Sequence, residues 1–578
     1  MSPMPRPVRP PRADLRSLTR LGVLLLGALV VTLGGCAGTP TRTAADVPDY
    51  EVLVRDLAAG RSTAWDALAP AFLARGDFSA RLDELTVLTE QLEARGARDP
   101  VAVADAMLDR YYGDLRAHEL RHRGALAVGD ADAAAFHLAA HDALVAAIEA
   151  TGDGSEEAPY AVLSANEALA WLQDRDAEIL GALYEVDDEA PSVTLLLRTR
   201  MAGADGLEDL RFDLGATFRA RRAVAAALPG GGHPSPSQVL AARAAQGDAA
   251  AQATYALALW QSDPAFAQRA IELLSAASDA GNLIARETLG AIYGSLASSR
   301  EGDEARELLD RAVDQFLLAV NQGSASAMYN LAQLYLSGHF GEENQFAGVS
   351  LLEQSADRDN VDALVLLARL HYNGQFVAQD RDRAVTLLER ACARGHTDAQ
   401  LFYARHLLTT DEGVGFDEQA AAWLTEAADA GASRPAMMLL ATLLAEGEHM
   451  DRDASAAVGW FKRAAEGSGD AELVNSVAWI LAVAEDRALR DPAAGLALMT
   501  TLMEEDGDAA ANPAYLDTWA AAHAATGDFE GAVRVQTGAV AIAEDELDPD
   551  GNPPDYLPVL REHLELFENG GTVSEDVP

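Results

Sequence analysis

A ladder of small and large apolar positions recurs through the second half of the chain. Counted from a glycine or its replacement, an alanine lies four residues on, a large apolar residue eight on, and Ala or Gly nine on. From residue 323 onward the ladder restarts every 36 residues. A repeat of this length is typical of a solenoid of helix pairs, because one such unit cannot bury its apolar face alone. The starting positions are Gly281, Gly323, Asp359, Gly395, Gly431 and Gly467.

Each unit predicts two helices. In the first helix, apolar residues recur every four positions, as in Ala327, Leu331 and Tyr335, and therefore share one face. In the second helix, alanines lie eleven and four residues before the next start. Such small residues let neighbouring helices approach closely. The glycine after the second helix suits a left-handed helix cap.

Two second-helix segments, EQAAAWLTEAADAG (418–431) and SAAVGWFKRAAEGSG (455–469), resemble the pattern of Sel1-like repeats, the bacterial relatives of tetratricopeptide repeats. The resemblance covers residues 239–475. Departures are Asp359 in place of Gly, a one-residue shift at Pro435, and 42 residues between Gly281 and the next start. The resemblance implies an αα-superhelical solenoid that holds other proteins on its surface and performs no chemistry of its own.

The pattern changes after this array. Residues 476–544 resemble the closing segment of tetratricopeptide arrays, with Leu516, Trp519 and Phe529 among the residues that carry the likeness. Terminal repeats end a stack with a more polar outer face. Residues 545–578 are acidic and rich in proline, and we expect them to form a C-terminal tail.

Residues 48–225 lack the ladder and predict a small α+β domain. Helical patterns fill residues 50–150, and the apolar period then changes to two at 193–197 and 210–214. Asp205-Gly206 between these runs favours a hairpin, so we expect an antiparallel sheet. The segments DLRAH (114–118), GDADAAAFH (129–137) and 147–169 resemble an uncharacterised domain family of exported bacterial proteins. That family has no known activity, so the resemblance suggests none for this domain. A Gly- and Pro-rich linker, 226–238, precedes the solenoid.

The N-terminus has the features of an export signal. Five arginines precede an apolar run from Leu21 to Leu33, which is short for a membrane span, and Gly34-Gly35-Cys36 follow. The segment resembles a bacterial lipoprotein signal, which implies removal of residues 1–35, acylation of Cys36, and a lipidated tether over 36–47. Ala37, rather than Asp, implies the outer membrane, facing the periplasm. An uncleaved helical anchor is the alternative.

A formal net charge of −46 excludes the usual surface of a nucleic-acid-binding protein. A solvated acidic surface explains this charge, and an acidic face on which a partner docks is the more specific hypothesis. The chain has two cysteines, Cys36 and Cys392. An acylated Cys36 cannot form a disulfide, and we interpret Cys392, next to Ala391 in a second helix, as a packed thiol.

One short motif offers chemistry. His118, Glu119 and His122 fit H-E-x-x-H, which places two imidazoles on one helix face for zinc, with Glu as general base. His137 and His141 repeat the spacing. Against a metal site, Arg121 and Arg123 bring positive charge, and no third-ligand pattern follows. We expect these histidines to pack within a helical hairpin, with no metal and no cofactor.

A second segment imitates a calcium loop, with Glu546, Asp548, Asp550 and Gly551 at suitable spacing. Its twelfth position is Leu557 where a bidentate carboxylate is needed, so we expect an acidic turn. Nucleophile-elbow, Walker and paired C-x-x-C motifs do not occur. The sequence predicts a non-catalytic, lipid-anchored envelope scaffold with protein partners. A zinc hydrolase using the histidine motif, and a module that binds cell wall or glycan, are the alternatives.

Overall fold

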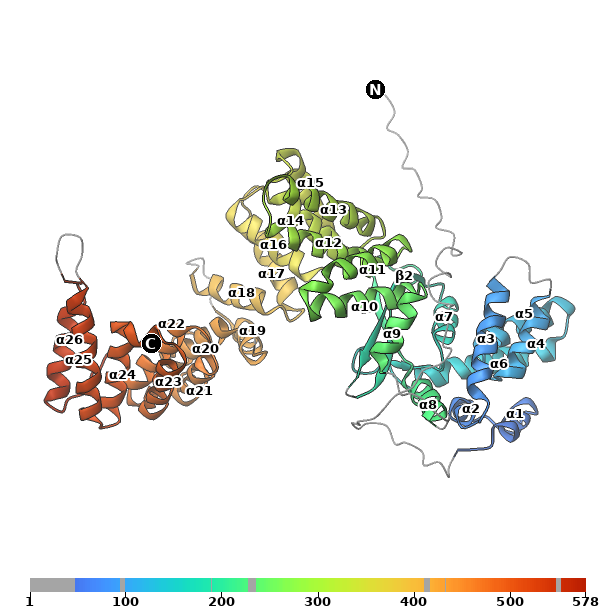
Figure 1. Ribbon diagram of the computed structural model, residues 1–578, viewed down its shortest axis with the longest axis horizontal. Coiled ribbons are helices and arrows are strands. Elements are labelled where there is room, and N and C mark those ends of the chain that lie inside the picture. The colour runs from blue at the N-terminus through green and yellow to red at the C-terminus, as the bar shows by residue number, and fades with distance from the viewer. Residues whose placement is uncertain are drawn as a thin grey trace, which may run out of the picture. The chain divides into compact units, whose positions relative to one another are not determined.

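The computed structural model describes residues 47–93, 99–188, 190–226, 235–409, 416–431, 433–546 and 553–577, and Figure 1 shows its helices and strands in chain order. The chain divides into two compact units, residues 1–360 and 361–578. The predicted signal, Cys36 and most of the tether lie outside the described residues, as does most of the predicted linker. Within the described residues the fold is mainly α, with 26 α-helices and one small sheet, as predicted.

The first unit begins with helices and a sheet, which agrees with the predicted small α+β region. Its helices before the solenoid are α1 (Tyr50–Ala58), α2 (Leu68–Leu73), α3 (Phe78–Glu93), α4 (Pro100–Arg110), α5 (Leu115–Val128), α6 (Ala131–Glu149), α7 (Ala165–Gln173) and α8 (Gly215–Ala226). Its strands are β1 (Tyr160–Ala161), β2 (Glu178–Asp187), β3 (Ser192–Arg200) and β4 (Glu208–Asp213). Among the described helices, α6 alone is long and apolar enough to cross a membrane by length and composition, a test that core helices also pass.

The sheet has the order β1-β4-β3-β2. The predicted hairpin is confirmed, because β3 and β4 pair antiparallel with Leu195 opposite Phe212. Two strands were not predicted: β1, which pairs parallel with β4, and β2, which pairs antiparallel with β3. Strand β2 is apolar on both faces, with Leu180 in one core and Tyr184 in another, so it shows no alternation of apolar and polar residues.

One face of the sheet packs against the first helices of the solenoid. The Tyr184 amide donates to Thr254 Oγ1 (2.8 Å), and Arg198 Nη1 donates to Glu287 Oε2 (2.6 Å). The helices of this part are α9 (Pro236–Ala245), α10 (Ala249–Ser262), α11 (Ala267–Asp279), α12 (Leu283–Ser298), α13 (Gly302–Asn321), α14 (Ala325–Leu336) and α15 (Glu342–Asp357). The sheet and the start of the solenoid therefore share one packed structure.

The second unit continues the pattern of helix pairs. Its first helices are α16 (Val361–Asn373), α17 (Arg381–Cys392), α18 (Thr397–Thr409), α19 (Glu418–Asp429), α20 (Arg434–Glu446) and α21 (Ala454–Ala465). Its closing helices are α22 (Ala471–Val483), α23 (Pro492–Glu505), α24 (Pro513–Ala525), α25 (Phe529–Asp545) and α26 (Leu557–Glu568). Helix α26 lies inside the predicted acidic tail and packs on α25 through Leu560 and Phe567.

Residues of the apolar ladder are buried, as their spacing predicts. The alanine four residues after each of the first four starts is fully buried: Ala285, Ala327, Ala363 and Ala399. All six starting residues have positive φ, and Asp359 (φ 60°) adopts the same conformation as the glycines. The longer interval after Gly281 is filled by α12 and by α13, which has 20 residues. A longer second helix thus accommodates the irregular unit while Ala312 stays in the seam.

Candidate functional site

The predicted histidine motif lies in a hairpin of α5 and α6. His118 is fully buried, and its Nε2 donates to the Tyr112 carbonyl oxygen at 2.8 Å. Because a carbonyl oxygen only accepts hydrogen bonds, Nε2 carries the one proton of the neutral His118 ring. Nδ1 of His118 is then an acceptor, and it receives the Nδ1 proton of His137 at 3.0 Å. Burial lowers the pKa of His118 to about 4 and also lowers the pKa of His137. Both ring nitrogens of His118 are therefore used in hydrogen bonds within the hairpin.

The other members of the motif also have protein partners. His122 Nδ1 donates to the Ala134 carbonyl oxygen at 2.8 Å, and Glu119 pairs with Arg123 on the same helix. His141 Nε2 lies 3.7 Å from Asp174 Oδ1. Among the described residues, no group of three or more His, Cys, Asp or Glu side chains is arranged to hold a metal ion. The geometry fits the packing of a hairpin.

Two further candidates from the sequence have structural roles where they are described. Cys392 is buried in α17, and burial raises the pKa of its thiol to about 12, which keeps the thiol protonated. In the calcium-like segment, residues 547–552 lie outside the described residues. Glu546 accepts a hydrogen bond from the Tyr556 hydroxyl, and Leu557 is buried at the start of α26. Glu546 therefore has a partner within the fold.

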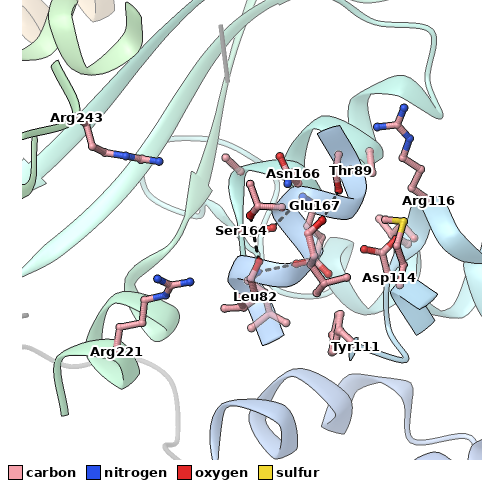
Figure 2. Close-up of a pocket in the computed structure, with 17 residues that line it drawn as sticks. Leu82, Thr89, Tyr111, Asp114, Arg116, Ser164, Asn166, Glu167, Arg221 and Arg243 are labelled. Carbon is pink, nitrogen blue, oxygen red and sulfur yellow. Dashed lines mark hydrogen bonds between the residues drawn. The ribbon is translucent and has the colours of Figure 1, made fainter. Parts of the chain in front are cut away.

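A polar pocket among α3, α5, α7 and α8 was not predicted from the sequence (Figure 2). Asp114 caps α5 by accepting from the Ala117 amide at 2.9 Å, and Glu167 accepts from the Leu163 amide at 2.6 Å. Ser164, the N-cap of α7, accepts from the Glu167 amide. A Ser-x-x-Glu capping pattern at 164–167 was the available signal, but it indicates a helix start and gives no hint of a pocket.

The two carboxyl groups of this pocket are held in an unfavourable environment. Burial and, to a smaller extent, the nearby Asp114 raise the pKa of Glu167 to about 7. Burial also raises the pKa of Asp114 to about 6. Desolvation disfavours the charged form of a carboxyl group. Near neutral pH both groups therefore retain a fraction of their protons.

Arg221 lies on the opposite side of Glu167 from Asp114 in the view of Figure 2. Its Nη2 donates to Asp83 Oδ1 at 2.7 Å, while Nε and Nη1 are buried without a partner among the described residues. The space that water can enter is about 50 Å³. A space of that size holds a few water molecules, which would satisfy these donors. The pocket is thus suited to bound water rather than to a substrate.

A larger groove lies in the second unit, between α22, α24 and α26. It leaves about 450 Å³ that water can enter. Trp479 and Ile480 of α22 face it together with Tyr556 and Val559 near the start of α26, and Asp517 and Thr518 come from α24. No Lys, Arg or His is among the described residues that line it. Its volume and apolar lining suit the side chains of another polypeptide.

Buried polar contacts connect the segments that form the groove. Asp517 Oδ1 accepts from Gln536 Nε2 at 2.6 Å and lies 2.8 Å from His563 Nδ1. The C-terminal segment is fixed beside α22, because the Glu575 amide donates to the Val483 carbonyl oxygen at 2.9 Å and the Glu485 amide donates to the Glu575 carbonyl oxygen at 2.7 Å. The first contacts join α24, α25 and α26, and the second join the C-terminal segment to the end of α22.

Comparison with known families identifies the repeats. The profile of the Sel1 repeat matches residues 251–282, 325–360, 361–396, 398–431 and 434–468. The chain carries five Sel1 repeats. Sel1-repeat proteins generally mediate protein–protein interactions, and this scaffold family is typically non-catalytic. The unmatched interval 283–324 is the irregular unit, which α12 and α13 occupy.

Several solved structures are similar to the chain. A Sel1 repeat protein from Oxalobacter formigenes is 21% identical, with 39% of this chain and 88% of that chain covered and a TM-score of 0.32. A protective antigen of uropathogenic Escherichia coli with an SLR fold is 18% identical, with 58% and 82% covered and a TM-score of 0.32. Yeast Tom70 is 9% identical, with 90% and 94% covered and a TM-score of 0.27. No curated protein matches the chain.

Proposed function

We propose that this protein is a lipid-anchored scaffold of the bacterial cell envelope, and that its Sel1 repeats bind a protein partner. The observation that carries the proposal is the array of five matched repeats with buried alanine seams. In such an array the seams hold the helices together, and the outward residues are left for contact with other proteins. Assembly of envelope machinery, such as polysaccharide export or secretion, is the kind of process such a scaffold serves.

Exposed apolar side chains support a role in binding. In the first unit, Phe346 on α15 is 75% exposed, and Leu317 and Leu318 on α13 are both exposed. Isolated exposed apolar residues are ordinary, but they become meaningful where a family binds proteins through the same helices. The acidic surface then adds charge selectivity to shape, since like charges are repelled during association.

The anchor is proposed from the sequence of residues 1–36. Five arginines, the apolar run and Cys36 support export and acylation of that cysteine. Two or more acyl chains on one protein hold it stably at a membrane, whereas one chain binds reversibly. In this proposal the acylated Cys36 holds the protein at the outer membrane, and the repeats face the periplasm.

Lipid labelling and fractionation test this placement. Cells fed a labelled fatty acid are expected to yield a labelled protein that sediments with outer membranes, and Cys36→Ala is expected to abolish the label and release the protein from that fraction. Cys392→Ala is the matched control and should leave both the label and the fractionation unchanged. Unlabelled wild-type protein in the soluble fraction would contradict the anchor.

The geometry favours neither alternative function. A zinc hydrolase needs ring nitrogens that point at a shared ion, and those of His118 are both hydrogen-bonded to protein. A glycan-binding site in residues 48–225 needs space for a sugar ring, and the pocket beside Glu167 in that region accommodates only a few water molecules.

A further inference from the structure

The groove between α22, α24 and α26 presents an apolar surface, and one polar atom beside it is buried without a partner among the described residues. Tyr556 is 42% exposed and Val559 is 48% exposed, and both face the groove beside Trp479. Asn475, on the same face of α22, has a side-chain oxygen that is buried without a partner among the described residues. A buried oxygen of this kind is costly unless a donor reaches it.

Carboxylates surround the apolar surface. Glu575 Oε2 accepts from the Trp479 indole nitrogen at 3.1 Å, which places this carboxylate next to a lining residue. Glu546 accepts from the hydroxyl of Tyr556, and Asp517 lines the groove itself. On α26, Arg561 pairs with Glu544 at 2.6 Å, and His563, whose pKa Asp517 raises, pairs with Asp517 at 2.8 Å. Glu546 and Glu575 therefore place negative charge beside the apolar lining of the groove.

We propose that this groove binds a polypeptide segment of a partner protein that carries Lys or Arg on either side of aliphatic or aromatic anchors. The anchors cover Trp479, Tyr556 and Val559, while the basic side chains meet Glu546 and Glu575. An acidic or phosphorylated segment would place like charges together, which is unfavourable in a partly desolvated groove. This inference rests on the proposed scaffold function and names the class of partner that one end of the array accepts.

Binding of designed peptides tests the inference. The probe is a fluorescent peptide of about ten residues that alternates Leu and Arg, and its counterpart has Glu in place of Arg. With the full chain in a nonionic detergent, we expect saturable binding of the basic peptide, at least about tenfold tighter than that of the acidic one, and weaker binding at high salt. Equal affinity for both peptides would overturn the proposal.

A matched pair of variants separates the groove from the general acidity of the chain. Val559→Arg adds a positive charge inside the groove, and Val87→Arg adds the same charge at a valine of α3 that is 51% exposed. We expect Val559→Arg to weaken binding of the basic peptide roughly tenfold or more and Val87→Arg to leave it unchanged. An equal effect of the two variants would contradict the proposed site. Tyr556→Ala, which changes no charge, should also weaken binding.

Two other results would reassign the groove. Concentration-dependent dimers of the wild-type chain that are lost in Val559→Arg would give the groove to a second copy of this chain and overturn the proposal. A partner that binds the repeats with unchanged affinity in Val559→Arg would overturn the inference and leave the scaffold function intact. The absence of a partner on any repeat would contradict the scaffold function itself.

Discussion

Asn282 and Ala182 connect the first stacked helices of the solenoid to the sheet. The Nδ2 atom of Asn282 donates to the Ala182 carbonyl oxygen at 2.7 Å. The Oδ1 atom of the same side chain accepts from the Ile284 amide at 3.1 Å and so caps α12. One fully buried side chain thus serves both the repeat and the strand. The sheet and the array are joined by a specific contact in addition to apolar packing.

Removing this side chain should cost more than the loss of a helix cap. Asn282→Ala loses a cap, worth about 1 kcal/mol, and leaves the Ala182 carbonyl buried without its donor, worth about 1–3 kcal/mol more. We expect the free energy of unfolding of the first unit to fall by about 2–4 kcal/mol, measured by urea denaturation.

Asn512→Ala is the control for the cap alone. Asn512 caps α24 by accepting from the Ala514 amide at 2.9 Å. Its replacement should cost only about 1 kcal/mol. Equal losses for the two variants would mean that the bond from Asn282 to the strand contributes nothing to stability.

A pair of glycines tests the helix caps. Gly247 has φ 92° and open space around the position of an added Cβ. Gly323 has φ 88°, but a Cβ there would lie 2.6 Å from Nη2 of Arg200, which donates to the Gln322 carbonyl oxygen. We expect Gly247→Ala to cost about 1–2 kcal/mol through backbone strain, and Gly323→Ala to cost about 1 kcal/mol more through the displaced guanidinium. Thermal unfolding of the two variants measures the difference.

The repeats were predictable because their signals are local. The spacing of Ala327, Leu331 and Tyr335 identifies a helix face, and the glycine after each second helix marks its cap. Even Asp359 keeps the left-handed conformation, since Asp tolerates it better than most residues. Strand β2 was missed because its two faces meet two different cores, an arrangement that depends on residues distant in sequence.

The candidate sites were less predictable than the fold. The histidine motif has zinc-like spacing, yet the spacing carries no information about Tyr112 and His137, which take the ring nitrogens of His118. The groove brings together Trp479 of α22, Asp517 of α24 and Tyr556, the N-cap residue of α26. Each of these residues is ordinary in its local sequence, so only the packing of the three helices shows that they share a surface.

The pocket carboxyl of Glu167 should make stability depend on pH. Its pKa is raised from 4.5 to about 7, so the folded chain binds more protons than the unfolded chain between these values. Stability then falls as pH rises through this window, by up to about 2–3 kcal/mol at pH 8. Glu167→Gln keeps an acceptor for the Leu163 amide and removes the charge, so it should stabilise the protein at pH 8 and have little effect near pH 4.

The control for this measurement is Glu157→Gln, which removes a charge from an exposed position. His118 contributes the opposite slope, because its lowered pKa makes stability fall as pH decreases from about 6.5 to about 4. That contribution is common to the wild type and both variants and cancels in their difference. A stability difference between wild type and Glu167→Gln that does not change from pH 4 to pH 8 would contradict the account.

Zinc content distinguishes a packed histidine hairpin from a metal site. Because the nitrogens of His118 are engaged and His122 Nδ1 donates to Ala134, we expect far less than one zinc per chain in elemental analysis of the purified protein. His118→Ala should leave the zinc content unchanged while it lowers stability, and His339→Ala, at an exposed histidine, should change neither. Near-stoichiometric zinc that His118→Ala removes would support the hydrolase alternative.

Site-specific photo-crosslinking in the native envelope tests the central claim, that the Sel1 repeats hold a protein partner. A photoreactive residue is placed at Phe346 or at Val559, which are exposed on the repeats and on the closing helices, and at Val87 as a control outside the array. The account predicts a discrete crosslinked protein from at least one position on the array and none from Val87. Crosslinking from no position on the array, in cells that contain the folded protein at its native level, would contradict it.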